Sequence, residues 1–182
     1  MNDALNLFNA GTSALRSGEI STATSLLRNA TDSATDPTIA CAAHRNLGIA
    51  LRRAGDDEAA LTEFKTALSI DTNDIESMYN LGNALVALGK HQEAIDAFRC
   101  VRELKPNWAQ PANNEGAVWM AIGDLHHAEA CFTEAIRIDP TFAHAWGNLG
   151  AVRAAIGRHA SPLHTLQRAL ALSPDDPAIR TQ

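Results

Sequence analysis

Residues 75–106 read IESMYNLGNALVALGKHQEAIDAFRCVRELKP, and this stretch predicts two helices joined by a short turn. In its first half, apolar residues such as Leu81 and Leu85 recur at three- and four-residue spacing, which is typical of one face of an α-helix. Gly89 is expected to end this helix, because glycine adopts the positive φ of a helix C-terminus without steric cost. The second half keeps the helical spacing and stops before Pro106, which cannot continue a helix.

The same pattern recurs along the chain with a period of 34 residues. Two glycine series carry it, one inside each first helix and one seven residues later at its end: Gly48, Gly82, Gly116, Gly150, and Gly55, Gly89, Gly123, Gly157. Gly11 and Gly18 keep the seven-residue gap but lie 37 residues upstream of the next pair. The first linker is therefore expected to be three residues longer than the others, around residues 36–39.

The internal glycine of each repeat lies within a helix, where glycine costs about 1 kcal/mol relative to alanine. Close approach of two helix backbones would explain this cost. We expect the glycine to face a column of small residues on the second helix, next to a column of large apolar residues: Ala23, Ala60, Ala94, Ala128, and Leu27, Phe64, Phe98, Phe132, Leu166. Glu115 and Arg153 stand where other repeats have leucine. Either the fourth and fifth repeats pack less tightly, or these two residues find polar partners.

Composition favours closely packed helices, because 46% of residues are hydrophobic while only 5% are aromatic. A net charge of −6 disfavours a general nucleic-acid binder. No apolar run approaches the roughly 20 residues that a membrane span needs, and the start Met1-Asn2-Asp3 lacks the features of a signal peptide. We expect a soluble cytoplasmic protein with no nucleic-acid or membrane partner.

Neither a metal site nor a catalytic motif is indicated. The odd set Cys41, Cys100 and Cys131 has no C-x-x-C spacing, so packed, reduced thiols are expected. The seven histidines lack the spacing of a zinc-protease helix, and no phosphate-binding loop or nucleophile elbow is present. The sequence therefore predicts no metal, no cofactor and no enzyme activity.

The repeat resembles the tetratricopeptide repeat (TPR), most clearly in Met78-x-x-Leu81-Gly82-x-x-Leu85 and in Trp146-x-x-Leu149-Gly150. The resemblance implies an all-α, right-handed superhelical solenoid of five helix–turn–helix repeats, forming a single domain over residues 1–182. The repeats are placed at about 4–37, 41–74, 75–108, 109–142 and 143–176. Residues 177–182 would begin an incomplete capping helix, with Asp176 and Pro177 as its start.

In such a solenoid the first helices line a concave groove, and one column of this groove is asparagine in all five repeats. It takes five of the chain's twelve asparagines: Asn9, Asn46, Asn80, Asn114 and Asn148. A carboxamide can bond both the C=O and the N–H of one peptide group, so this asparagine column predicts a site for a polypeptide backbone. A similar asparagine ladder lines the TPR region of O-linked N-acetylglucosamine transferases. The alternative is that these amides bond only neighbouring backbone.

The flanking columns predict how the groove changes along the chain. Its start would be basic and would attract an acidic segment or a C-terminal carboxylate, through Arg16, Arg45, Arg52 and Arg53. The alternative is a solvated face with acidic neighbours such as Asp56 and Asp57. Further along, the side chains that line the groove become small and weakly apolar. The candidate peptide contacts there are Tyr79, Asn83, Asn113, Met120 and His144.

These observations favour a protein–protein interaction scaffold that holds a peptide segment of a partner in the groove. One alternative is a structural or assembly factor that self-associates through its poorly capped C-terminal end, where several leucines would be partly exposed: Leu163, Leu166, Leu170 and Leu172. Another alternative is a substrate-targeting arm of a larger enzyme such as a glycosyltransferase.

Overall fold

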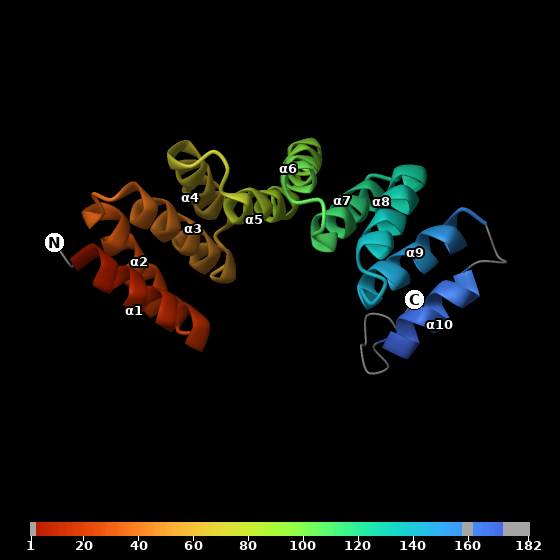
Figure 1. The fold of residues 1–182 in the computed structure, drawn as a ribbon, viewed down its shortest axis with the longest axis horizontal. Coiled ribbons are helices and arrows are strands. Elements are labelled where there is room, and N and C mark those ends of the chain that lie inside the picture. The colour runs from red at the N-terminus through yellow and green to blue at the C-terminus, as the bar shows by residue number, and fades with distance from the viewer. Residues whose placement is uncertain (1–2, 158–161, 173–182) are drawn as a thin grey trace. The chain divides into compact units, whose positions relative to one another are not determined.

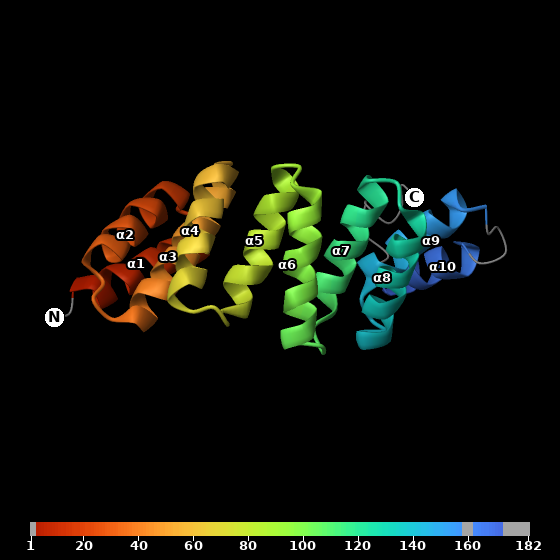
Figure 2. The ribbon, with the colours of Figure 1, turned by 90° about the horizontal axis from the view of Figure 1, so that it is seen from above.

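A computed structural model describes residues 3–157 and 162–172 of the chain, and every regular element in this part is a helix. The elements form pairs that follow one another along the chain (Figures 1 and 2). The helices are α1 (Asp3–Ser17), α2 (Ile20–Ser33), α3 (Pro37–Arg53), α4 (Asp57–Ile70), α5 (Ile75–Ala87), α6 (His91–Leu104), α7 (Ala109–Ala121), α8 (Leu125–Ile138), α9 (Ala143–Ala155) and α10 (Pro162–Leu172). The all-helical, five-pair architecture expected from the repeat is confirmed.

The chain divides into two compact units, Met1–Ala97 and Phe98–Gln182, which are described separately. In the N-terminal unit, α1 packs on α2 and α3 on α4, while the first helices α1, α3 and α5 also contact one another in sequence. In the C-terminal unit, α7 packs on α8 and α9 on α10, and α7 contacts α9. That the two units form one continuous domain stays a prediction.

The glycine series that was expected to end the first helices does so. Gly55 has φ +87° and follows α3, and Gly89 has φ +70° and follows α5. The Gly55 N–H donates to Arg52 O and the Asp56 N–H to Leu51 O, both at 3.0 Å. These two bonds satisfy carbonyls that the helix end leaves open and reverse the chain into α4.

The three extra residues near position 37 lengthen a helix and not a linker, so the expectation of a longer first linker was wrong. Helix α3 has 17 residues, whereas α5, α7 and α9 have 13 each. The Asp36 carboxylate accepts from the Thr38 N–H at 2.8 Å, and Pro37 occupies the first turn. Because an N-cap aspartate and a proline at the first helical position both favour helix initiation, the additional residues form a further turn.

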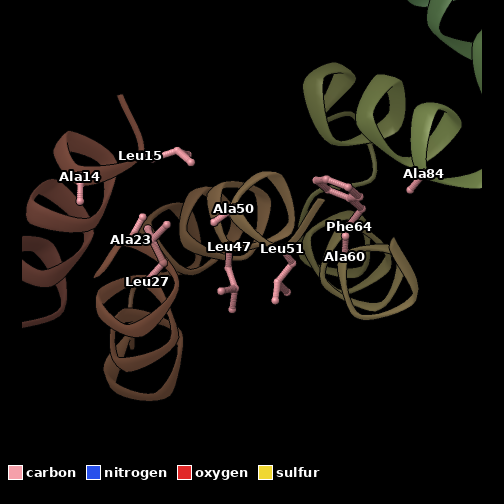
Figure 3. Close-up of a cluster of buried hydrophobic side chains, with 10 residues drawn as sticks. All are labelled: Ala14, Leu15, Ala23, Leu27, Leu47, Ala50, Leu51, Ala60, Phe64 and Ala84. Carbon is pink, nitrogen blue, oxygen red and sulfur yellow. The ribbon is translucent and has the colours of Figure 1, made fainter. Parts of the chain in front are cut away.

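The core of the N-terminal unit joins α1 to α5 through small and large apolar side chains (Figure 3): Ala14, Leu15, Ala23, Leu27, Leu47, Ala50, Leu51, Ala60, Phe64 and Ala84. The internal glycine faces the large column of this core, which corrects the expected pairing with the alanine column. A Cβ placed on Gly48 would lie 2.6 Å from Phe64 Cε1, and one on Gly11 would lie 2.7 Å from Leu27 Cγ. The glycine therefore makes room for a ring or a leucine of the second helix.

The C-terminal unit repeats this arrangement, since a Cβ on Gly116 would lie 2.8 Å from Phe132 Cε1. The two departures from the apolar pattern have found polar partners, as one of the two alternatives predicted. Glu115 accepts from Arg102 at 2.5 Å and from Trp119 Nε1 at 3.3 Å. Arg153 Nε donates to Glu129 Oε1 at 2.8 Å.

The cysteines are free thiols, two of them packed as expected. Cys41 and Cys131 are buried, whereas Cys100 is exposed. Burial raises the pKa of the Cys41 thiol to about 11 and that of Cys131 to about 12, with nearby carboxylates adding to the shift. Both buried thiols therefore stay protonated at neutral pH.

The predicted C-terminal surface is only partly described. Leu170 is 37% exposed and Leu172 is half-buried, while the side chains of Leu163 and Leu166 and the expected capping helix at 177–182 lie outside the described residues. Self-association through this end stays a prediction. Within residues 3–157 and 162–172, no helix has the length and apolar character to cross a membrane.

Candidate functional site

The asparagine column lies on the first helices of the pairs. Asn9 is on α1, Asn46 on α3 and Asn80 on α5 in the N-terminal unit, and Asn114 on α7 and Asn148 on α9 in the C-terminal unit. Asn9 is exposed and the other four are half-buried. We call the surface that these helices share in each unit its first-helix face. None of the five column asparagines is therefore buried.

Two of the column amides bridge neighbouring first helices. Asn46 Nδ2 donates to Thr12 Oγ1 at 2.9 Å, which joins α3 to α1. Asn148 Nδ2 donates to Asn113 Oδ1 at 3.0 Å, which joins α9 to α7. Each bond occupies one N–H of a group that has two donors and one acceptor oxygen. The amides are therefore held in one orientation and keep further hydrogen-bonding groups.

The alternative interpretation of the column, local bonding to backbone, holds for Asn80. Asn80 Nδ2 donates to Glu76 O, one turn earlier in α5, at 2.8 Å. The Oδ1 of Asn114 accepts from the side chain of its neighbour, Asn113 Nδ2, at 3.3 Å. Four of the column amides therefore form hydrogen bonds within the protein, and these bonds do not share one common partner: Asn46, Asn80, Asn114 and Asn148.

Arg45, expected to make the start of the groove basic, is neutralised inside the protein. Its Nη1 lies 2.8 and 2.9 Å from the two carboxylate oxygens of Asp74, and its Nε lies 3.4 Å from Glu76. Asp74 is only 8% exposed and also accepts from Ser77 Oγ at 2.5 Å. This arginine fastens α3 to the start of α5.

Sequence reasoning did not identify Asp74 as a partner of Arg45. The position directly before α5 suggests an N-cap, yet its carboxylate makes no side-chain cap bond. The two residues are 29 positions apart, so no local spacing rule relates them. The 34-residue period carries no signal either, because Trp108 and Phe142 occupy the positions equivalent to Asp74 in the next two repeats.

The other three arginines of the predicted basic region divide into paired and unpaired charges. Arg52 Nε lies 3.2 Å from Asp57 Oδ1. Arg53 Nη1 donates to the neutral carbonyl of Leu15 at 2.8 Å, so its positive charge is not compensated there. Arg16 is exposed. The uncompensated charge of this region is therefore carried by Arg16 and Arg53.

The remaining predicted contacts vary in accessibility. Tyr79 and Asn83 are half-buried on α5, and His144 is exposed at the start of α9 with its ring centroid 6.0 Å from that of Phe142. Met120 packs against the core cluster of the C-terminal unit, and Asn113 is buried. The last two therefore contribute to the structure of α7 as well as to its surface.

Helix pairs interlocked by a glycine against a large side chain, with a polar face on every first helix, define an α-helical repeat protein. Two family profiles match the sequence, both described as tetratricopeptide repeat, at residues 38–107 and 120–177. Together they cover more than half of the chain, which belongs to the tetratricopeptide repeat family. Proteins of this family generally mediate protein–protein interactions and are generally not enzymes.

Solved structures of low sequence identity share the fold of this chain. The chain is similar to MamA from Desulfovibrio magneticus RS-1, with 20% identity, 97% of this chain and 98% of that chain covered, and a TM-score of 0.85. It is similar to YrrB, described as a TPR protein with an unusual peptide-binding site, with 23% identity, coverage of 99% and 91%, and a TM-score of 0.77. It is also similar to the thermophilic TPR protein TTC0263 from Thermus thermophilus, with 22% identity. The match covers 98% of this chain and 95% of that chain, with a TM-score of 0.73. No curated protein sequence matches the chain significantly.

Proposed function

We propose that the first-helix faces hold an extended segment of a partner polypeptide and that the column asparagines bond its backbone. The observation that carries this proposal is the occurrence of a surface-accessible asparagine at the same place on all five first helices. These positions recur with the 34-residue period although they contribute nothing to the interlocking of glycine and large side chains.

The ordered amides favour binding of a peptide backbone. Asn46 and Asn148 are already fixed by their bonds to Thr12 and Asn113. A flexible side chain that is ordered only on binding loses about 0.5–1.5 kcal/mol, and this loss is smaller for a side chain held in advance. Each amide keeps an acceptor oxygen and a second N–H for a peptide group.

The surroundings of the column favour loose recognition of the partner's side chains. Val86, Ala87 and Ala121 are exposed next to the column and offer small apolar contacts. The attraction for acidic residues on the face itself is weaker than the arginine count suggests, because Arg45 and Arg52 are paired with acidic residues. The asparagine ladder of O-linked N-acetylglucosamine transferases and the peptide-binding site in YrrB's description supply precedents within the fold.

Peptide-library selection followed by titration tests this function. Peptides selected on the immobilised wild-type protein are titrated against the wild type and against the double variant Asn80→Ala/Asn114→Ala. We expect the double variant to bind about tenfold or more weakly, since a net hydrogen bond contributes about 0.5–1.5 kcal/mol and each amide is proposed to make more than one. Its thermal midpoint is expected to stay within about 2 °C of the wild type, which corresponds to a change of less than about 1 kcal/mol.

The matched control is Asn6→Ala/Asn73→Ala, which removes two exposed asparagines that lie outside the column. This control should bind as the wild type does. Equal weakening in both double variants, or a loss of folding in the column variant that accounts for the weaker binding, would rule out a specific role of the column.

A further inference from the structure

The N-terminal unit has a hollow away from the asparagine column, between α2 and the C-terminal end of α3. Its volume is about 570 Å³, within the range of about 300–1,000 Å³ in which proteins bind small molecules and side chains. Helix α2 is the second helix of its pair, and the hollow includes none of the column asparagines. The hollow and the column can therefore be tested independently.

Two arginines line this hollow, and none of its described lining residues is acidic. Arg53 is held in place by its 2.8 Å bond to Leu15 O, a neutral partner that leaves the guanidinium charge uncompensated. Arg28 is exposed on α2. This differs from Arg45 and Arg52, whose charges are neutralised by Asp74 and Asp57. The hollow therefore concentrates positive charge on a chain whose net charge is −6.

The rest of the lining adds neutral donors and an apolar surface. Ser21, Ser25 and Asn29 supply hydroxyl and amide groups along one side of α2, and Ile20 is half-buried at its start. Guanidinium groups bond carboxylates through several N–H donors at once. A ligand that fits this lining carries a carboxylate beside an apolar group.

We propose that this hollow docks an acidic segment of a partner polypeptide, with a carboxylate bonded by Arg28 and Arg53 and a neighbouring apolar side chain packed against Ile20. This site goes beyond the backbone-binding role of the first-helix faces. The sequence predicted that acidic residues bind at the start of the groove, whereas this site lies beside α2 in the N-terminal unit. Binding here depends on opposite charge, so it weakens as salt concentration rises.

The test uses the full chain and a fluorescein-labelled hexapeptide of alternating glutamate and leucine, titrated by fluorescence anisotropy at low salt. A second peptide has glutamine in place of every glutamate. The wild type is expected to bind the glutamate peptide at least about tenfold more tightly than the glutamine peptide. Arg28→Gln/Arg53→Gln should lose most of this preference.

The charge-matched control is Lys65→Gln/Lys90→Gln, which removes two exposed cations of the same unit that do not line the hollow. We expect its affinity to stay within about twofold of the wild type, because neither lysine lines the hollow where the carboxylate is bonded. The double variant loses the Arg53 bond to Leu15 O, which could disturb folding. In that case the single variant Arg28→Gln tests the proposal, because Arg28 is exposed on the surface of α2 and its replacement leaves that bond intact. This single change should weaken binding by about threefold or more.

Four results would overturn the proposal. They are equal binding of the two peptides, equal weakening by the arginine and lysine variants, full affinity in Arg28→Gln, and binding of inorganic phosphate without binding of the glutamate peptide. If the third of these results, full affinity in Arg28→Gln, is accompanied by weaker binding in Asn80→Ala/Asn114→Ala, the acidic peptide binds on the first-helix faces instead. That last result would leave the proposed function intact.

Discussion

Glu115 and Arg102 form an ion pair at positions that are apolar in neighbouring repeats. Leucine stands at the position of Glu115 in three other repeats, as Leu47, Leu81 and Leu149, and Leu68 and Ile136 stand at the position of Arg102. Glu115 is 3% exposed. Burial lowers the pKa of the Arg102 guanidinium, but its hydrogen bond and attraction to Glu115 outweigh this and raise the pKa above its ordinary value. The Arg102 guanidinium is therefore kept charged, beside the Glu115 carboxylate, at a place where the fold accepts two apolar side chains.

Replacing Glu115 and Arg102 by leucine, first singly and then together, should show that the two charges stabilise each other. Glu115→Leu alone is expected to lower the free energy of unfolding by about 3 kcal/mol, because it leaves the Arg102 charge partly buried without its carboxylate. Glu115→Leu/Arg102→Leu should recover the wild-type value or exceed it, since a well-packed apolar pair often replaces a buried ion pair without loss. Urea unfolding of the wild type, both single variants and the double variant measures the coupling. Losses that simply add would contradict it.

Helix starts in this chain depend on single aspartates. Asp36 accepts from the Thr38 N–H at 2.8 Å before α3, Asp56 from Ala59 at 3.1 Å before α4, and Asp124 from His127 at 3.1 Å before α8. In α3 the cap stands before a turn that α5, α7 and α9 lack. This turn brings Cys41 and Arg45 into a long continuous helix that reaches Asp74.

Removal of the α3 cap should therefore fray this additional turn. Asp36→Ala is expected to lower the free energy of unfolding by about 1 kcal/mol and to speed amide hydrogen exchange in the first turn of α3. Asp36→Asn keeps a side-chain acceptor and should restore most of the protection, because asparagine caps helices about as well as aspartate. Thr35→Ala, a change at the exposed neighbouring residue, serves as the control. Unchanged exchange in Asp36→Ala would show that Pro37 suffices to start the helix.

At the scale of the whole molecule, the two compact units carry different spectroscopic probes. All three tryptophans, Trp108, Trp119 and Trp146, belong to the C-terminal unit Phe98–Gln182. Helices of repeat proteins contact mainly their neighbours in sequence, and cooperativity can break down along such a chain. Tryptophan fluorescence therefore reports on one unit, whereas far-UV circular dichroism reports on both.

Gly48→Ala should destabilise the N-terminal unit more than the C-terminal unit. Its new Cβ would lie 2.6 Å from the buried Phe64 ring, and overpacking of this kind costs about 1–3 kcal/mol. The gain in helix propensity returns only about 1 kcal/mol, so a net loss is expected. The denaturation midpoint by circular dichroism should fall further than the midpoint by tryptophan fluorescence. The control Ser13→Ala, a change at an exposed residue of α1, should shift neither midpoint to a lower denaturant concentration. Equal shifts of the two midpoints in Gly48→Ala would mean that the units unfold together.

The sequence by itself determined the helix pairs, their ends and the place of the asparagine column. These features depend on local backbone preferences and on the 34-residue period. Gly55 and Gly89 end their helices because the chain there needs a positive φ, and the apolar spacing assigns each residue to a face. The all-helical fold was therefore predictable, and so was the surface position of Asn9.

Only the tertiary structure decided which side chains meet across helices. It placed Phe64 and not Ala60 against Gly48 and neutralised Arg45 through Asp74. It also held Arg53 beside Leu15 at the edge of the hollow between α2 and α3. Such contacts join residues 16 to 38 positions apart, and they depend on helix packing and side-chain direction, which a periodic pattern does not specify. For this reason the sequence located the asparagine column, whereas the charges available to a ligand followed from the packed structure.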